Sequence, residues 1–185
     1  MSDDHDRRDV LDLKYYHGLL QREDIKDLLR NNGDFLVRMS EPVTGEPRSY
    51  VLSVMSSRVR DDIKHIVVKQ TEAGRFFFES DSFPSIRELI DYYHKSKISL
   101  SKSTTVVLKN PIGRQPWEIS HDDIECTKKL GEGAFGEVHK GTLRRHGERR
   151  SAIVAIKVAK LETMTKEQIK DLMREVRIGK NSKCV

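Results

Sequence analysis

Residues 33–40 read GDFLVRMS, a strand-like stretch that places one charged residue inside an apolar run. Side chains alternate between the two faces of a strand, so Leu36 and Arg38 share one face. Burying an unpaired guanidinium is costly, and such a residue usually has an anionic partner. Three interpretations follow: Arg38 pairs with a carboxylate of its own fold, receives a phosphate from a ligand, or lies on a solvated sheet face.

The elements around this stretch predict an α+β fold. Apolar residues at helical spacing, runs of aromatic and β-branched residues, and turn-forming breakers define them. In chain order they are a helix over 21–31, strands over 33–40, 48–56 and 62–70, an extended piece over 75–80 and a helix over 82–95. Residues 106–108 are a candidate for a last short strand. This order predicts a central antiparallel sheet with one helix on each face.

Composition narrows the possible functions. The chain has 185 residues, 34% of them charged, and a formal net charge of +5 with both signs interspersed, which does not predict nucleic-acid binding. We interpret the most basic run, 144–150, as a solvated hairpin loop. The only cysteines, Cys126 and Cys184, lack disulfide or metal-ligand spacing, which favours a cytoplasmic protein without a metal site. No apolar segment could span a bilayer, and Ser2 excludes a myristoylation signal, so membrane recruitment would require partners.

Roughly residues 14–110 resemble the Src homology 2 (SH2) domain. Residues 15–18 (YYHG) match its opening motif, 35–38 (FLVR) its phosphate-binding strand, and 64–66 (KHI) its specificity strand. Residues 83–93 match its second helix. The resemblance implies a module that binds phosphotyrosine peptides, with tyrosine-phosphorylated proteins as partners.

The same resemblance implies roles for individual residues. Arg38 would bind the phosphate through the planar fork of its guanidinium, and Arg22 would lie against the phosphotyrosine. For His65 we favour a buried histidine held by a backbone partner over direct phosphate contact. Ile66 and Tyr93, on the other side of the sheet, would select an apolar ligand residue after the phosphotyrosine. The implied phosphotyrosine-binding residues are Arg22, Arg38, Ser40, Glu41, Thr44 and His65.

Residues 131–136 read GEGAFG, a motif that is weak by itself. A dinucleotide-binding fold requires a helix after it, and residues 137–143 favour a strand instead. A P-loop is excluded because no Gly-Lys-Ser/Thr ends the run. Together with 154–157 (VAIK), the motif resembles the small lobe of protein kinases. Residues 117–124 (WEISHDDI) resemble non-receptor tyrosine kinases of the Fes/Fer type.

The kinase resemblance implies ATP and Mg²⁺ as cofactors. Lys157 would pair with Glu175 of the following helix, which a capping box of Thr165 and Gln168 should open. An ordinary surface lysine and glutamate are the alternative. The implied ATP-binding residues are Gly131, Glu132, Gly133, Ala134, Phe135, Gly136, Val138, Ala155, Lys157 and Glu175.

We therefore expect four segments: a flexible N-terminus (1–13), an SH2 domain (14–110), a linker (111–123) and an incomplete kinase N-lobe (124–185). No H-R-D or D-F-G motif follows, so we expect no catalytic residues, no kinase activity from this chain alone, and weak or no nucleotide binding. The leading hypothesis is adaptor-like binding of phosphotyrosine peptides. The alternatives are a fragment or short form of an active tyrosine kinase, and a scaffold whose half-lobe recruits a partner.

Overall fold

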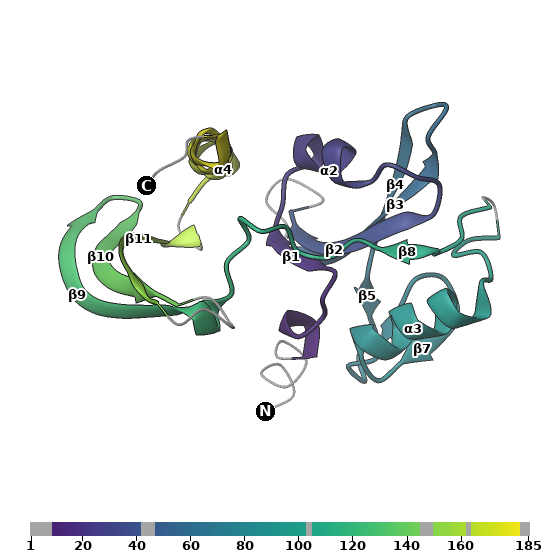
Figure 1. Cartoon of the computed structure of the whole chain (residues 1–185). Coiled ribbons are helices and arrows are strands. Elements are labelled where there is room, and N and C mark those ends of the chain that lie inside the picture. The colour runs from purple at the N-terminus through teal and green to yellow at the C-terminus, as the bar shows by residue number, and fades with distance from the viewer. Residues whose placement is uncertain (1–8, 42–46, 103–104, 145–149, 162–163, 182–185) are drawn as a thin grey trace. The chain divides into compact units, whose positions relative to one another are not determined.

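The chain forms two compact units, Met1–Arg114 and Gln115–Val185. The computed structural model describes residues 9–41, 47–102, 105–144, 150–161 and 164–181 (Figure 1). No helix within these ranges is long and apolar enough to cross a membrane.

Among its described residues, the first unit contains two small sheets and the helices α2 and α3. The central sheet has the order β1-β2-β3-β4, with β8 beside β2. A second sheet has the order β5-β6-β7. The elements are β1 (Tyr16–Leu19), α2 (Arg22–Leu28), β2 (Asp34–Ser40), β3 (Ser49–Ser57), β4 (Asp62–Val67), β5 (Lys69–Gln70), β6 (Phe76–Phe77), β7 (Ser82–Phe83), α3 (Ile86–Ser96) and β8 (Asn110–Pro111).

The predicted α+β class is confirmed, with two differences in the strands. Strands β2, β3 and β4 are antiparallel as predicted, but β1 and β8 both run parallel to β2. The last strand lies at Asn110–Pro111 and not at 106–108. Residues 106–108 instead supply core side chains, since Val106 and Leu108 are buried.

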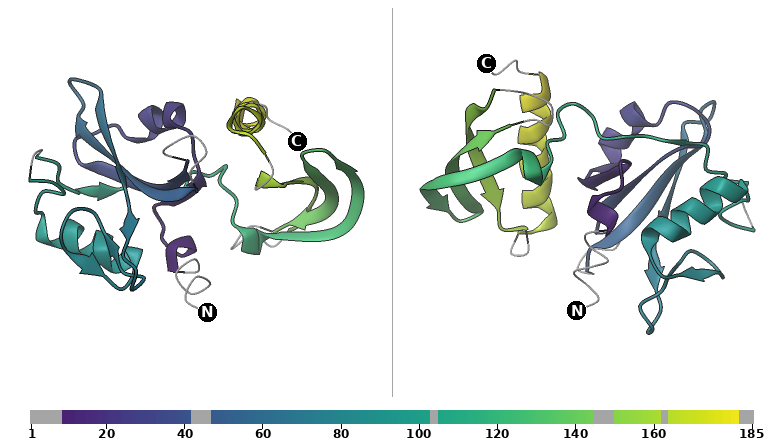
Figure 2. Two further views of the ribbon diagram at one scale, coloured as in Figure 1. Left: turned by 180° about the vertical axis from the view of Figure 1, so that it is seen from behind. Right: turned by 60° about the horizontal axis from the view of Figure 1, so that its bottom comes forward.

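The two faces of the central sheet bury different residues. On one face, Phe35 and Val37 of β2 belong to a core cluster with Leu89 and Ile90 of α3. The opposite face carries Leu36 and Arg38, and α2 buries Ile25, which lies outside that cluster. Figures 1 and 2 show the two helices on opposite sides of the sheet. Arg38 therefore lies on the α2 side.

The first unit extends beyond the predicted limits of 14 and 110. Val10 and Leu13 are each only 1% exposed and belong to the core cluster, so residues 9–13 are not a flexible tail. At the other end, Ile112 donates its backbone N–H to Phe35 (2.8 Å). The Arg114 side chain donates to the carbonyl of Tyr16 (3.0 Å) and to that of Leu11. Residues 111–114 thus belong to this unit and not to a linker.

The second unit is a three-stranded antiparallel sheet with one long helix. The sheet order is β11-β10-β9, and α4 runs across one face (Figure 2). The predicted capping box is present: Gln168 N–H donates to Thr165 Oγ1 (3.3 Å), and Thr165 N–H donates to Gln168 Oε1 (2.8 Å). The elements are the 3-10 turn η1 (His121–Asp123), β9 (Ile124–Gly133), β10 (Gly136–Leu143), β11 (Ala152–Ala159) and α4 (Lys166–Asn181).

The described residues of this unit bury little apolar surface. Ile169 is the single buried apolar side chain among its described residues, whereas Ile153 and Leu130 are 73% and 57% exposed. Helix α4 continues through Gly179, a residue type that often ends helices, to Asn181.

Candidate functional site

Arg38 is almost completely buried, with 1% of its surface exposed. Its Nε donates to Ser53 Oγ (3.2 Å), and its Nη1 donates to the carbonyl of Leu20 (3.1 Å), just before α2. Both acceptors are neutral. Within the described ranges, no carboxylate forms an ion pair with Arg38.

His65 completes a three-residue network with Arg38 and Ser53. The register pairs Ser53 of β3 with His65 of β4, and His65 Nδ1 lies 3.0 Å from Ser53 Oγ. The half-buried imidazole is therefore held by a side-chain hydroxyl, not by the backbone partner that we expected. Because Ser53 and Leu20 anchor the guanidinium from two sides, its position is fixed before any ligand arrives.

Positive charge dominates the electrostatics of this network. Burial, followed by the nearby Arg22 guanidinium, lowers the pKa of Arg38 to about 10, so Arg38 stays cationic at neutral pH. Burial, Arg38 and Arg22 together lower the pKa of His65 to about 4, so His65 is neutral there. The site thus carries two arginine charges beside one neutral histidine, and the nearby Glu23 carboxylate partly offsets the lowering of the pKa of Arg38.

The other predicted phosphotyrosine-site residues lie at the rim or outside the described part. Arg22 is the exposed first residue of α2, and its electrostatic effect on Arg38 and His65 places it nearby. Ser40 is the half-buried last residue of β2, on the same strand face as Arg38, and Glu41 follows it. Thr44 lies outside the described residues.

A pocket of about 380 Å³ lies beside α3, on the other side of the sheet. Its apolar members include the predicted specificity residue Tyr93, which is 4% exposed. Ile66, the second predicted specificity residue, packs against the core cluster and does not line this pocket. The lining residues are Glu79, Ser80, Asp81, Tyr93, Ile98, Ser99, Leu100, Ser101, Lys102 and Thr105.

The glycine-rich hairpin of the second unit joins β9 to β10. The register pairs Val138 with Lys157 and Gly131, so these residues share one sheet face, on which Ala155 of β11 also lies. Lys157 is exposed and makes a polar interaction. The side chain of Glu175 lies outside the described part of the chain, so its predicted pairing with Lys157 stays a prediction.

The three glycines of this hairpin differ in whether a side chain would fit at their position. A Cβ on Gly131 or Gly133 would meet nothing within 4 Å. Gly136 has φ +152°, and a Cβ there would lie 2.1 Å from the carbonyl oxygen of Val158. Gly136 is therefore required for packing within the sheet. The open space at the other two glycines fits a close approach by a ligand. Ala134 and Phe135, which lie between Gly133 and Gly136 at the tip of the hairpin, are exposed.

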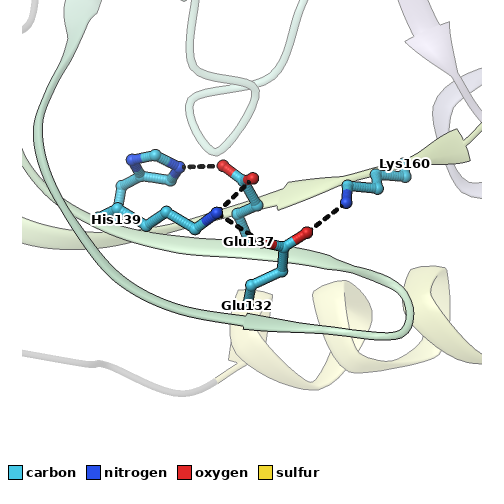
Figure 3. Close-up of polar contacts among 5 residues, drawn as sticks. Glu132, Glu137, His139 and Lys160 are labelled. Carbon is cyan, nitrogen blue, oxygen red and sulfur yellow. Dashed lines mark hydrogen bonds and ion pairs between the residues drawn. The ribbon is translucent and has the colours of Figure 1, made fainter.

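Ion pairs between charged side chains link the strands of the same hairpin on the face opposite Lys157 (Figure 3). Glu132 pairs with Lys129 (2.6 Å) and Lys160 (2.5 Å). Glu137 pairs with Lys129 (2.7 Å) and His139 (2.8 Å). The hydrogen bonds from the two lysines lower the pKa of Glu132 to about 2. Glu132 is thus engaged within the sheet, which separates it from the residues on the Lys157 face.

Ser53 is the important site residue that sequence reasoning missed. It is 0% exposed and links Arg38 to His65. The available signal was a polar residue flanked on both sides by apolar residues, Ser53 in the run VLSVM. The pocket residues Glu79 and Asp81 were also missed, because exposed acids near turns are common and carry no periodic signal.

Comparisons with known proteins agree with this geometry. A family model described as SH2 domain matches residues 15–93, and one described as protein tyrosine and serine/threonine kinase matches residues 124–184. Fer-related kinase 1 of Caenorhabditis elegans is 36% identical over 173 residues, 92% of this chain and 42% of that protein. Human tyrosine-protein kinase Fer is 38% identical over 167 residues, 90% of this chain and 19% of that protein.

A viral tyrosine-protein kinase is also similar to this chain over most of its length. The tyrosine-protein kinase transforming protein Fps of avian sarcoma virus is 31% identical over 166 residues, 90% of this chain and 29% of that protein. The chain thus spans less than half the length of these three relatives. An SH2 domain implies phosphotyrosine-containing partners, and the kinase homology implies ATP and Mg²⁺ use in the family. The chain contains an SH2 domain followed by the start of a protein tyrosine kinase domain, and its homologues are tyrosine kinases of the Fer/Fes type.

Proposed function

We propose that the first unit binds phosphotyrosine peptides and that Arg38 receives the phosphate. One observation carries this proposal: a guanidinium buried to 1% exposure has neutral hydrogen-bond partners and no ion pair among the described residues. A buried charge without a counter-charge is costly, and a bound phosphate would supply the counter-charge. The lowered pKa of Arg38, caused chiefly by burial, agrees with this cost.

The surrounding residues suit a doubly negative ligand. Arg22 lies close enough to lower the pKa values of Arg38 and His65 and is exposed at the start of α2, where it can reach a phosphate or an aromatic ring. Ser40, Glu41 and Thr44 follow Arg38 along the chain and would offer hydroxyl and backbone donors. His65 positions Ser53 and the ring of the ligand without contributing charge. Tyr93, which lines the pocket beside α3, would act on ligand residues beyond the phosphotyrosine.

Replacing Arg38 tests this function. For Arg38→Met we expect a loss of about 2 to 5 kcal/mol in binding a phosphotyrosine peptide, measured by fluorescence polarisation. Arg22→Ala, at an exposed position, should weaken binding by a smaller amount without affecting folding. Arg60→Met is the matched control, because Arg60 is an exposed arginine in the turn between β3 and β4. Equal binding of phosphorylated and unphosphorylated peptide, or unchanged affinity in Arg38→Met, would refute the proposal.

A second candidate function is transfer of the ATP γ-phosphate to protein tyrosine, and the relatives named as tyrosine kinases favour it. Val138, Ala155 and Lys157 share a sheet face against which the adenine and phosphates of ATP would lie, beneath the open space at Gly131 and Gly133. When bound, ATP supplies the phosphoryl group. Within the described ranges no group of three His, Cys, Asp or Glu residues could hold a metal ion, so we assign no Mg²⁺ ligand.

The two candidates make different predictions for a polypeptide of these 185 residues. Its sequence contains no H-R-D or D-F-G motif, so we expect no tyrosine autophosphorylation and a rise in melting temperature below about 1 °C with Mg-ATP. Autophosphorylation that Lys157→Met abolishes would instead establish the chain as an enzyme.

We further propose a cytoplasmic location, since the two cysteines provide no disulfide framework.

A further inference from the structure

The pocket beside α3 combines an apolar wall with an acidic rim. Tyr93, Ile98 and Leu100 supply the apolar surface, and Ile98 is 41% exposed and so accessible to a ligand. Exposed Glu79 and Asp81 supply two carboxylates. A ligand side chain that enters this pocket therefore meets apolar contacts along its length and negative charge at the rim.

The two carboxylates are not equally free. Glu79 accepts the backbone N–H of Lys102 (3.3 Å), and hydrogen bonds from Ser101 and Lys102 lower its pKa. Asp81 accepts one long hydrogen bond from Ser80 Oγ (3.4 Å), and it has no ion pair within the described ranges. Asp81 also helps to raise the pKa of Tyr93, after burial, which places its charge close to the phenol that lines the pocket.

From this arrangement we propose that the pocket selects an arginine or lysine of the phosphotyrosine ligand, a few residues from the phosphotyrosine. The inference rests on the proposed function of Arg38 and adds the class of ligand. The aliphatic stem of a basic side chain packs on Ile98 and Leu100, while its charge meets Asp81. An arginine can also stack on Tyr93. An aliphatic ligand residue would leave Asp81 unpaired beside it.

This inference reverses the expectation drawn from the sequence. The aliphatic Ile66 predicted an apolar ligand residue, but Ile66 is half buried against the core and does not line the pocket. Lys102 is the one cation in the lining, and it lowers the pKa of Glu79 through its charge and backbone N–H. Because hydrogen bonds from Ser101 and from the Lys102 backbone engage Glu79, the less engaged carboxylate that a ligand meets is that of Asp81.

A phosphotyrosine peptide library with each of the five following positions varied in turn tests the proposal on the full chain. We expect enrichment of arginine and lysine over isoleucine and leucine at one position, by about three- to fivefold in affinity, the upper end of the range for an exposed charge pair. In Asp81→Asn this preference should fall to within about twofold, and 0.5 M NaCl should reduce it in the parent. Glu72→Gln is the matched control, because Glu72 is exposed and lies outside the pocket lining.

The outcomes separate this inference from the proposed function. Tight phosphotyrosine-dependent binding with an aliphatic preference, or with a basic preference that Asp81→Asn leaves intact, overturns the inference alone. No phosphotyrosine-dependent binding at all overturns the proposed function and this inference with it. Unchanged affinity of Asp81→Asn for an isoleucine-containing phosphopeptide excludes misfolding as the reason for a lost preference.

Discussion

The side chains around Arg38 form a site whose charge is set by burial. Arg38 and His65 are pushed in the same direction, towards the neutral form, because both lose contact with water and lie near Arg22. Arginine begins from so high a pKa that it stays charged, whereas histidine loses its charge. The same environment therefore yields one permanent cation and one neutral hydrogen-bonding group, which suits a phosphate receptor that is constant across physiological pH.

His65 should make the stability of the first unit depend on pH. Its pKa is about 4 in the folded chain against an ordinary value of 6.5, so the unfolded state binds the proton first as the pH falls. Stability from His65 is complete above pH 6.5 and is lost progressively between 6.5 and 4, by up to about 3 kcal/mol, less solvent screening at a half-buried site. Urea unfolding of His65→Gln should show a smaller loss between pH 7 and 4.5 than the parent, while the exposed His121→Gln should follow the parent. Equal losses in the parent and in His65→Gln would show that the histidine titrates normally.

Sequence predicted the charged members of this site but not the groups that hold them. Arg38 stands out because a cation inside an apolar strand needs a partner. Ser53 and the Leu20 carbonyl become partners only through the β2–β3 register and the path of the chain into α2. Both depend on tertiary packing, which no local pattern encodes.

At the scale of elements, sequence periodicity located the strands and helices well and their ends less well. The first helix was predicted over 21–31, with Gly33 just beyond it, yet α2 ends at Leu28. Gly33 instead enters β2 with φ +87°, and a Cβ there would lie 2.5 Å from the Lys109 side chain. Glycine is therefore required at position 33 because the chain next to β8, more than seventy residues away in sequence, passes close to it, and not because a helix ends there.

The segment before β1 shows why the domain limit was placed too late. Residues 1–9 are polar and acidic with no apolar stretch, so the composition at this end resembles that of a flexible tail, but Val10 and Leu13 directly after them fill the core. Asp9 also pairs with Arg87 of α3 (2.8 Å). A short segment such as this one is held by a few contacts with residues distant in sequence. The spacing of its apolar residues does not predict such contacts.

Leu13 and Leu11 provide a matched test of this docking. Leu13 is 1% exposed and Leu11 is 40% exposed, so the same truncation removes buried surface in one case and mostly exposed surface in the other. Leu13→Ala should reduce the free energy of unfolding of the first unit by about 2 to 4 kcal/mol, and Leu11→Ala by about 0.5 kcal/mol or less. Urea denaturation followed by circular dichroism measures both. Similar small effects of the two substitutions would mean that the segment does not contribute to the core.

At the scale of the whole molecule, the two units differ in how much apolar surface they bury. The first has a core cluster drawn from its sheet, from α3 and from both of its ends. The second has one buried apolar side chain among its described residues, and Ile153 and Val158 of β11 are 73% and 43% exposed. Because apolar burial is the main favourable term in folding, the second unit should be much the less stable.

Trp117 allows this difference to be measured, since it is the only tryptophan of the chain and lies in the second unit. In a urea titration, tryptophan fluorescence should change at a lower denaturant concentration than circular dichroism, which reports on both units. A phosphotyrosine peptide at about one hundred times its Kd should stabilise the later transition by about 2.7 kcal/mol and leave the earlier one in place, because the peptide binds only the folded first unit. Coincident transitions that the peptide shifts together would instead show that the kinase segment and the SH2 domain unfold as one cooperative body.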